Sequence, residues 1–432
     1  MSAAWLLSRM HDVVLFEKEP RLGGHSNTVD AIESHRSVAI DTGFIVYNTA
    51  CYPNLIALFE HLGVPTAQTD MSFSVSLDGG RYEYNGNGAA GFFGQRSNLL
   101  SPGHWRMARD VRRFFSEAAL LQQEADDPSL TLAAWLEQRR YSRNFIEHHI
   151  VPMGAAIWSA SGSDILGFPA QAFARFFANH GLLQMNDRPA WRTVRGGSRE
   201  YVSRLMSDYR GAVAKGDGAT SIKRSAAGVT VRTARGTSAE FDRCLIACHA
   251  DDALGLLADA SPDERRLLGA FRYASNDTIL HTDVSLMPRR RRVWTSWNYL
   301  GTTGAAAGNN ASVTYWMNKL QPLETSRDYF VSLNPAVPVA ADKIIARFSY
   351  QHPLFDTAAL AAQKNLWPLQ GRNSTWYAGS YFGYGFHEDG LQAGLAAAED
   401  LSGLRRPWSV EGQSSRLTFS KPDRAQHQVA AQ

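Results

Sequence analysis

The sequence predicts a mixed α/β protein that combines a Rossmann-like dinucleotide-binding domain, incomplete at its N-terminus, with an interleaved second domain. Three observations predict this class. The chain opens with a helix, a tight turn and an apolar strand that ends in an acid. A long helical block with a set of strands occupies the middle, and a strand, a glycine-rich turn and an alanine-rich helix follow near the C-terminus. At 432 residues the chain exceeds one hydrophobic core, so we expect two connected domains.

Composition excludes several classes of protein. Hydrophobic residues make up 44% and charged residues 20%, as in ordinary globular proteins. The net charge of +3 does not suggest a nucleic-acid binder. The one local basic run, Arg289 to Arg292, predicts a solvated turn, with an anion or membrane contact as the alternative. The absence of a signal peptide and of a run of eighteen apolar residues favours a cytoplasmic enzyme.

The three cysteines do not define a site. They are too few and too scattered for a disulfide framework. Cys244 and Cys248 flank an apolar stretch, and no second Cys or His pair with ligand spacing accompanies them, so we predict no metal site.

The N-terminal segment has the second half of a dinucleotide-binding βαβ unit. Residues 2–9 predict an amphipathic helix, and the apolar run 13–16 predicts a buried parallel strand. Glu17 then stands where such units place the acid that binds the adenosine ribose. The first apolar strand and the G-x-G-x-x-G loop, which would cradle a pyrophosphate, do not precede the helix.

Two loops follow this strand. In the first, EKEPRLGGHS, the paired Gly23 and Gly24 let the backbone pass close to a ligand and Arg21 can reach a phosphate; the alternative is a plain surface turn. The second, starting at Asp41, follows a strand at 37–40. Asp41 could also cap the helix near Pro53, although twelve residues is too far for direct capping.

The middle of the chain predicts a helix at 53–62, a hairpin of 72–77 with 81–84 around a Gly-containing turn, and a helical block over 104–180. We expect the block to form a substrate cap whose aromatic residues serve mainly as core. Further strands are predicted at 221–223, 229–232, 241–248, 271–283, 294–299, 312–317 and 329–332, with a helix at 199–206 before them. Aromatic residues in the last four strands form either the floor of an apolar cavity or a packed sheet.

The C-terminal part carries the most specific pattern. A strand at 374–379 leads into a glycine-rich turn and an alanine-rich helix at 391–401, where small residues allow close packing. A helix that begins after such a turn directs its positive dipole end at a ligand. The alternative is a simple turn before a packing helix.

These motifs resemble those of the FAD-dependent amine-oxidase-like oxidoreductases. The E-x-x-x-R-x-G-G pattern from Glu17 is similar to that of amine oxidases, phytoene desaturases and protoporphyrinogen oxidases. Together with DTGFIVYN and YAGSYFGYGFHEDGL, it looks like a bacterial group of predicted NAD/FAD-binding proteins associated with cyclopropane-fatty-acid synthases. The resemblance covers residues 1 to about 410. Gly379-Ser380 departs from the Gly-Glu of typical amine oxidases, which argues against a close monoamine or polyamine oxidase.

The resemblance implies FAD as the cofactor. NAD and FAD both use the βαβ unit, but the C-terminal turn favours FAD. The residues that match the family's flavin contacts are Glu17, Arg21, Gly23, Gly24, His25, Asp41, Thr42, Gly43, Ile222, Gly379, Ser380, Gly385, Phe386 and His387. The implied domains are a discontinuous FAD-binding domain (1–50, 190–255 and 370–410), a substrate or cap domain (51–189 and 256–369) and a polar tail (411–432).

The function that follows is flavin-dependent oxidation or desaturation of an apolar substrate, of fatty-acyl type. The alternatives are a redox-neutral flavoprotein isomerase or mutase, and a non-catalytic flavin-binding partner of a lipid-modifying enzyme. His387 and His281 are the predicted catalytic residues, with His25 as a third candidate. The expected partners are an apolar small molecule or lipid, a membrane surface contacted peripherally and a lipid-modifying enzyme, with no nucleic acid.

The resemblance begins at Ser2, where a glycine-rich loop would already have been completed. We therefore expect the reading frame to extend upstream of Met1 and to encode an apolar strand and a glycine loop. If it does not, we expect a natural fragment that binds FAD less tightly.

Overall fold

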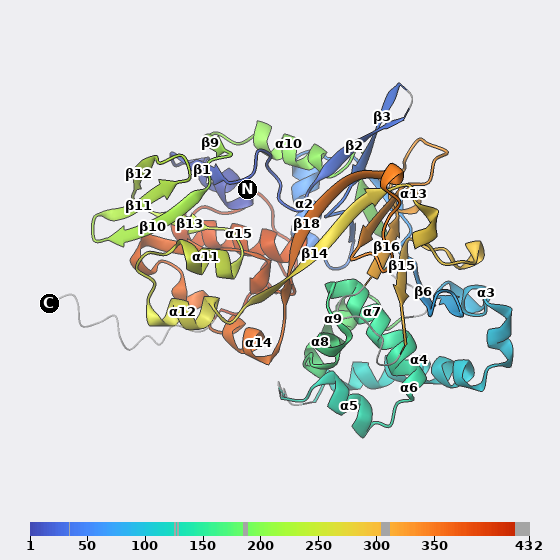
Figure 1. Ribbon diagram of the computed structural model, residues 1–432. Coiled ribbons are helices and arrows are strands. Elements are labelled where there is room, and N and C mark those ends of the chain that lie inside the picture. Colours follow the sequence, from blue (N-terminus) through green and yellow to red (C-terminus); the bar gives the residue numbers. More distant parts are fainter. Residues whose placement is uncertain (34, 125–126, 128, 185–188, 304–311, 420–432) are drawn as a thin grey trace.

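The computed structural model describes residues 1–432 except 34, 125–126, 128, 185–188, 304–311 and 420–432. The chain folds into a mixed α/β structure with two ends, as predicted (Figure 1). One end holds the short parallel strands with α11 (Ala250–Leu256), α12 (Pro262–Leu268) and α15 (His387–Ser402). The other holds a large sheet and the helical block. The predicted domain boundaries stay a prediction.

The parallel strands form two separate pairs. β1 (Val14–Glu17) pairs with β9 (Ala212–Lys215), and β13 (Cys244–Ile246) pairs with β19 (Thr375–Tyr377). Within the described residues no strand lies between β1 and β13. The prediction that the first strand is buried is therefore wrong: Val14 is 39% exposed, because β1 has a neighbouring strand along one edge only.

An antiparallel sheet next to these pairs corrects a second prediction. Its strands are β10 (Ala219–Ser225), β11 (Gly228–Thr233) and β12 (Ser238–Phe241). The predicted single strand over 241–248 is in fact two, because the chain leaves this sheet after Phe241 and enters another at Cys244.

Four helices surround a compact second core. They are α1 (Ser2–Leu7), α2 (Pro53–His61), α10 (Arg199–Ser207) and α15 (His387–Ser402). The helices predicted at 2–9, 53–62 and 199–206 are thus confirmed. α1 crosses α15 closely: a Cβ atom on Gly394 would lie 2.6 Å from Ser2 Oγ, so the Ser2 hydroxyl would have to rotate to admit a larger residue. α15 begins four residues before its predicted start.

A seven-stranded sheet forms the other end, in the order β18-β14-β17-β16-β15-β6-β7. The predicted hairpin and the four later strands are confirmed as β6 (Phe73–Leu77), β7 (Tyr82–Asn85), β14 (Arg272–His281), β15 (Trp297–Gly301), β16 (Ser312–Trp316) and β17 (Phe330–Leu333). β18 (Ile344–Leu354) was not predicted. It pairs along its whole length with β14.

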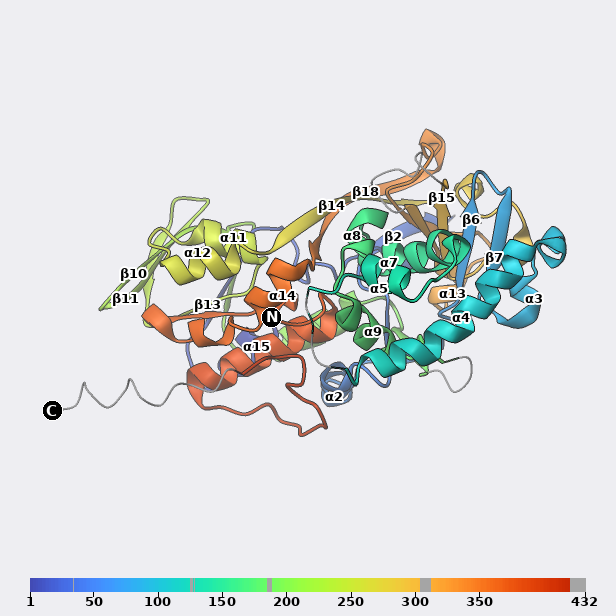
Figure 2. The ribbon, with the colours of Figure 1, turned by 90° about the horizontal axis from the view of Figure 1, so that it is seen from below.

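Helices cover one face of this sheet (Figure 2). The predicted helical block is confirmed by α4 (Pro102–Leu121), α5 (Leu132–Gln138), α6 (Arg143–Phe145), α7 (Val151–Trp158), α8 (Gly162–Leu166) and α9 (Ala170–Asn179). The short α3 (Gly88–Phe92) precedes the block and was not predicted. α7 contacts both β15 and β18. Its neighbours Phe173 and Phe177 are buried core residues, as expected for most of the block's aromatics.

The remaining elements connect the two ends. They are β2 (Thr28–Glu33), β3 (Arg36–Asp41), β4 (Val46–Asn48), β5 (Thr66–Thr69), β8 (Trp191–Val194), α13 (Met317–Leu320) and α14 (Thr357–Gln363). The strand predicted at 37–40 is part of β3.

The C-terminal segment is not a loose tail where the structure describes it. Arg416 forms an ion pair with Asp389 at 3.2 Å, and Leu417 is buried. The tail at 411–432 stays a prediction as a domain boundary, but Arg416 and Leu417 connect its described part to the rest of the fold. The rest of the predicted tail, 420–432, lies outside the described residues.

Candidate active site

A large cavity runs between the two ends of the described part of the molecule. Its volume is about 2200 Å³, well above the 300–1,000 Å³ of a typical pocket for one small ligand. It extends from β1 and α1, past the first turn of α15, to the large sheet and α7. A cofactor and a substrate can therefore share it.

One end of the cavity carries the predicted nucleotide-binding residues. Glu17 lines it at the end of β1, where its carboxylate accepts a hydrogen bond from Glu19 N at 3.0 Å. Arg21 and the buried Ile222 also line it. The paired glycines adopt positive φ angles, +113° at Gly23 and +55° at Gly24, which explains why the turn requires glycine.

Asp41 has a different position from the one predicted. Thr42 and Gly43 line the cavity, whereas Asp41 is not among its lining residues. Its buried carboxylate accepts hydrogen bonds from Ser198 N and Ser198 Oγ, both at 2.8 Å, and from Thr28 Oγ1 at 2.6 Å. Burial raises the pKa of Asp41 to about 6. Asp41 thus joins its loop to the start of α10.

The predicted C-terminal turn faces the cavity directly. Gly379, Ser380, Gly385, Phe386 and His387 all line it. They lie where β19 ends and α15 begins, so the first turn of α15 points its backbone N–H groups toward this space.

His387 is fixed by a polar and an aromatic contact. Its Nε2 lies 2.7 Å from the hydroxyl of Tyr201, which in turn lies 2.5 Å from Ser26 Oγ. Its ring stacks on Phe44 with the centroids 4.0 Å apart. Burial lowers the pKa of His387 to about 3, so the imidazole is neutral at physiological pH.

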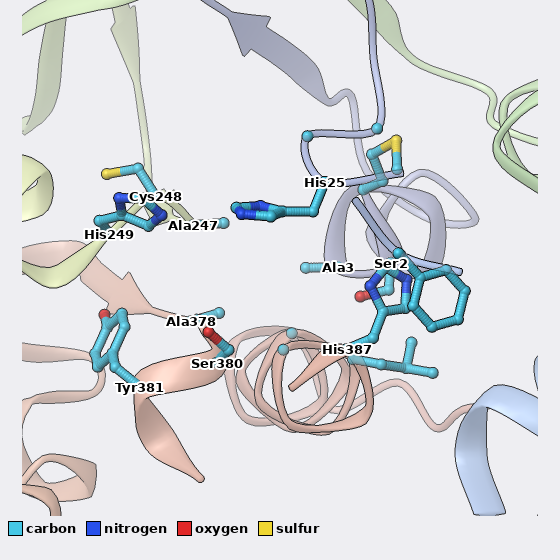
Figure 3. Close-up of a pocket in the computed structure, with 18 of the residues that line it drawn as sticks. Ser2, Ala3, His25, Ala247, Cys248, His249, Ala378, Ser380, Tyr381 and His387 are labelled. Carbon is cyan, nitrogen blue, oxygen red and sulfur yellow. The ribbon is translucent and has the colours of Figure 1, made fainter. Parts of the chain in front are cut away.

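His25 lies across the cavity from these residues. Figure 3 shows its ring pointing toward the loop that carries Cys248 and His249. Its Nε2 is buried and has no hydrogen-bond partner. Burial lowers the pKa of His25 to about 4, so its imidazole is neutral at neutral pH.

Two residues of β18 that the sequence analysis missed complete this group. The ring centroids of Tyr350 and His352 lie 5.0 and 5.5 Å from that of His25. His352 Nδ1 lies 3.1 Å from Asn276 Nδ2. The side-chain oxygen of Asn276 accepts a hydrogen bond from Asn334 Nδ2, and this contact fixes the orientation of the Asn276 amide. His352 Nδ1 therefore accepts a hydrogen bond from Asn276, and His352 Nε2 carries the proton. The alternation of polar and apolar residues over 346–352 was the signal for this strand.

The far end of the cavity is apolar. The side chains there come from β6, α7, α9, β15, β16, β17 and β18, and they include Met71, Phe73, Met153, Ile157, Trp158, Phe176, Trp297, Tyr315, Leu333 and Phe348. No Asp, Glu, Lys or Arg is among the lining residues that these elements contribute. The aromatic floor expected from the strands is present at Trp297 and Tyr315.

His281 and two aromatic residues of the predicted strands lie outside the cavity. His281 is fully buried in β14, with Nε2 2.8 Å from Ser332 Oγ, and is not a lining residue of the cavity. Trp294 and Trp316 pack against Arg291 instead of the cavity. His249 occupies the N-cap position of α11 without a side-chain cap, and it lines the cavity stacked on Tyr273.

The fold and the site together define an enzyme that binds a dinucleotide cofactor beside an apolar substrate space. The family model for flavin containing amine oxidoreductases matches residues 1–285, so the chain belongs to that family. The chain is accordingly a flavin-dependent oxidoreductase, and FAD is its cofactor. No curated protein matches the sequence.

Solved structures with the same fold include three enzymes. A fatty acid isomerase from P. acnes that produces CLA matches with a TM-score of 0.63 at 13% identity, over 93% of this chain and 95% of that one. Putrescine oxidase bound to putrescine matches with 0.65 at 14%, over 93% and 96%. Cyclohexylamine oxidase from Brevibacterium oxydans matches with 0.63 at 15%, over 93% and 96%. At these identities the likeness shows the fold alone.

The residues present fit a flavin. Small side chains line the middle of the cavity, among them Ser2, Ala3, Ala247 and Ala378 (Figure 3), which leaves room for a flat ring system. His25 lines the same space, and its buried Nε2 has no hydrogen-bond partner among the described residues. Glu17 and Arg21 would hold the adenosine and phosphate part, and the turn at Gly379 to His387 would hold the flavin.

Proposed function

We propose that this chain uses FAD to oxidise or desaturate an apolar, chain-like substrate of fatty-acyl type. The observation that supports this is the charge-free, apolar far end of the cavity. Burying an unpaired ammonium or carboxylate group costs several kcal/mol or more, so such a space favours a hydrocarbon over an ionised group.

The same observation narrows the form of the substrate. A free fatty acid would need a cation for its carboxylate, and a primary amine would need an acid or an equivalent partner. The charged lining residues, such as Glu17 and Arg21, all lie at the cofactor end. An esterified acyl chain, whose head group stays outside the apolar space, therefore fits best.

FAD, when bound, supplies the hydride acceptor for such an oxidation. The proton that leaves with the hydride needs a base in the cavity, and we assign this role to His25. Its Nε2 is unpartnered, whereas Nε2 of His387 is occupied by Tyr201 and His281 does not reach the cavity.

The test is incubation of the FAD-loaded protein in air with phosphatidylglycerol vesicles that carry defined acyl chains, followed by mass spectrometry of the chains. Loss of two hydrogen atoms per chain supports the proposal. An unchanged mass with a double bond at a new position would instead show an isomerase, and one structural neighbour is named as a fatty acid isomerase. Unaltered chains would overturn lipid oxidation.

A matched pair of variants localises the substrate. Ile157→Asp places a carboxylate at the apolar end and is expected to lower kcat/KM at least a hundredfold, whereas Ile157→Val is expected to change it less than about tenfold. Both variants must retain the flavin absorbance band. Equal effects would show that the chain does not occupy this space. The cytoplasmic location and a lipid-modifying enzyme as partner also remain proposals.

A further inference from the structure

One surface far from the cavity exposes large apolar side chains. Leu99 is 50% exposed, Leu100 88% and Trp105 52%. They lie within seven residues, at the junction of the 3₁₀ helix Arg96–Leu100 and α4. Most other exposed large hydrophobic side chains of the described chain are scattered singly, which is normal for a protein surface.

These side chains are held in place by local contacts. The indole N–H of Trp105 donates a hydrogen bond to Leu99 O at 2.9 Å, and its ring packs on Phe93 with centroids 4.8 Å apart. Ser101 caps the start of α4. We call Leu99, Leu100 and Trp105 the apolar knob. The hydrogen bond, the ring contact and the helix cap together hold the apolar knob in one conformation.

Arginines flank the apolar knob on the exposed face of α4. Arg106 is next to Trp105, and Arg109 and Arg112 follow it one and two turns later. Between residues 86 and 116 the chain has five arginines and one acidic residue, the buried Asp110. The whole chain, in contrast, is nearly balanced, with 44 basic and 41 acidic residues.

The other candidate for such a surface was the basic run at 289–292. Arg290 is paired with Glu83 at 2.8 Å, and Arg291 is paired with Asp328 and packed on Trp294. Half of this run is thus used within the protein. The α4 face is the stronger cationic surface.

From this arrangement we propose that the apolar knob and the arginines of α4 dock the protein on an anionic phospholipid membrane. Tryptophan and leucine insert at the boundary between head groups and acyl chains, and arginines bind the lipid phosphates. No described helix is long and apolar enough to cross a bilayer, so contact of this kind is a surface attachment. Figures 1 and 2 show α3 and the start of α4 at the end of the molecule opposite β10–β12.

The docking proposal goes beyond the proposed function. The two proposals are compatible, because a membrane is a source of esterified acyl chains. The test does not depend on turnover. The FAD-loaded protein is sedimented with vesicles of phosphatidylcholine alone and with vesicles that contain 40% phosphatidylglycerol, at low and at physiological salt. We expect at least tenfold tighter binding to the anionic vesicles, weakened by salt.

Two surface variants and two control variants locate the surface. Leu99→Ser/Leu100→Ser and Arg106→Gln/Arg109→Gln/Arg112→Gln are each expected to weaken binding at least tenfold. Leu120→Ser, at the other end of α4 and 58% exposed, is the apolar control, and Arg232→Gln/Arg235→Gln, on a distant hairpin, is the charge control. Equal melting temperatures establish that all variants fold.

Two results would overturn the proposal. One is a wild-type protein that fails to sediment with anionic vesicles. The other is loss of binding in the controls to the same extent as in the surface variants. A protein that binds no vesicle but requires Leu99 and Leu100 to bind a purified lipid-modifying enzyme would assign the surface to a protein partner instead.

Discussion

The hydroxyl of Tyr201 on α10 lies 2.7 Å from Nε2 of His387, the first residue of α15. The same hydroxyl lies 2.5 Å from Ser26 Oγ, in the loop that follows the paired glycines. One tyrosine therefore connects three segments that are far apart in the sequence. These are the segments that the family resemblance assigns to the flavin or to the return of the chain to the cofactor domain.

Tyr201→Phe removes both contacts and leaves the ring in place. We expect a loss of about 1–2 kcal/mol in the free energy of unfolding, because buried polar partners lose a hydrogen bond. Chemical denaturation measures it. Tyr381→Phe is the matched control, since the buried hydroxyl of Tyr381 has no partner and its removal should cost little. Equal losses in the two variants would contradict the role of Tyr201.

Arg416→Met tests the packing of the C-terminal segment over α15. The change leaves the buried carboxylate of Asp389 without its ion pair, and we expect a loss of about 3 kcal/mol in stability. The double variant Arg416→Met/Asp389→Asn should recover part of this loss. Arg143→Met, which breaks an exposed pair with Glu147, is the control, expected within about 1 kcal/mol of wild type. Comparable losses of stability in Arg416→Met and Arg143→Met would show that the buried ion pair of Arg416 with Asp389 contributes no more than an exposed one.

His281 predicts a dependence of stability on pH. Burial lowers its pKa to about 4 in the folded protein, below the value of about 6.5 expected when unfolded. Between these values the unfolded chain binds a proton that the folded chain does not, so stability falls as the pH drops below 6.5. His281→Gln should shrink the difference in unfolding free energy between pH 7.5 and pH 5 by about 2 kcal/mol. His11→Gln, at an exposed position, is the control and should leave this difference unchanged. A difference in His281→Gln as large as in the wild type would refute the prediction.

His25→Asn tests the proton acceptor. We expect kcat to fall by about 10²- to 10⁴-fold with the flavin still bound, because general base catalysis contributes about that much. We expect the wild-type rate to fall at acid pH as His25 is protonated, and this fall should disappear in the variant. His387→Asn is the comparison. A large loss of kcat in His387→Asn, with kcat unchanged in His25→Asn, would assign the general base to His387 instead.

The sequence predicted much of this fold because local patterns determine it. The Gly23-Gly24 turn, the hairpin at 78–80 and the helix after Gly385 each require a backbone conformation that only a few residues adopt, and all three are present. The periodic apolar residues of α2, α4 and α9 were equally informative, because one side of each helix is buried.

What the sequence did not predict depends on contacts between distant segments. β18 was missed although it carries Tyr350 and His352 and its residues alternate over 346–352. Asp41 lies beside a predicted site but is buried against Ser198, and this contact across 157 residues has no local signal. The burial of β1 was overpredicted because a strand's neighbours are set by the whole sheet.

The central claim is that the apolar end of the cavity delivers a hydrocarbon chain to the flavin. It is tested most directly by anaerobic mixing of the FAD-loaded protein with either an esterified acyl lipid or a primary alkylamine of the same chain length. We expect the flavin absorbance near 450 nm to bleach with the lipid and to stay unchanged with the amine. Bleaching by the amine and not by the lipid would contradict the account.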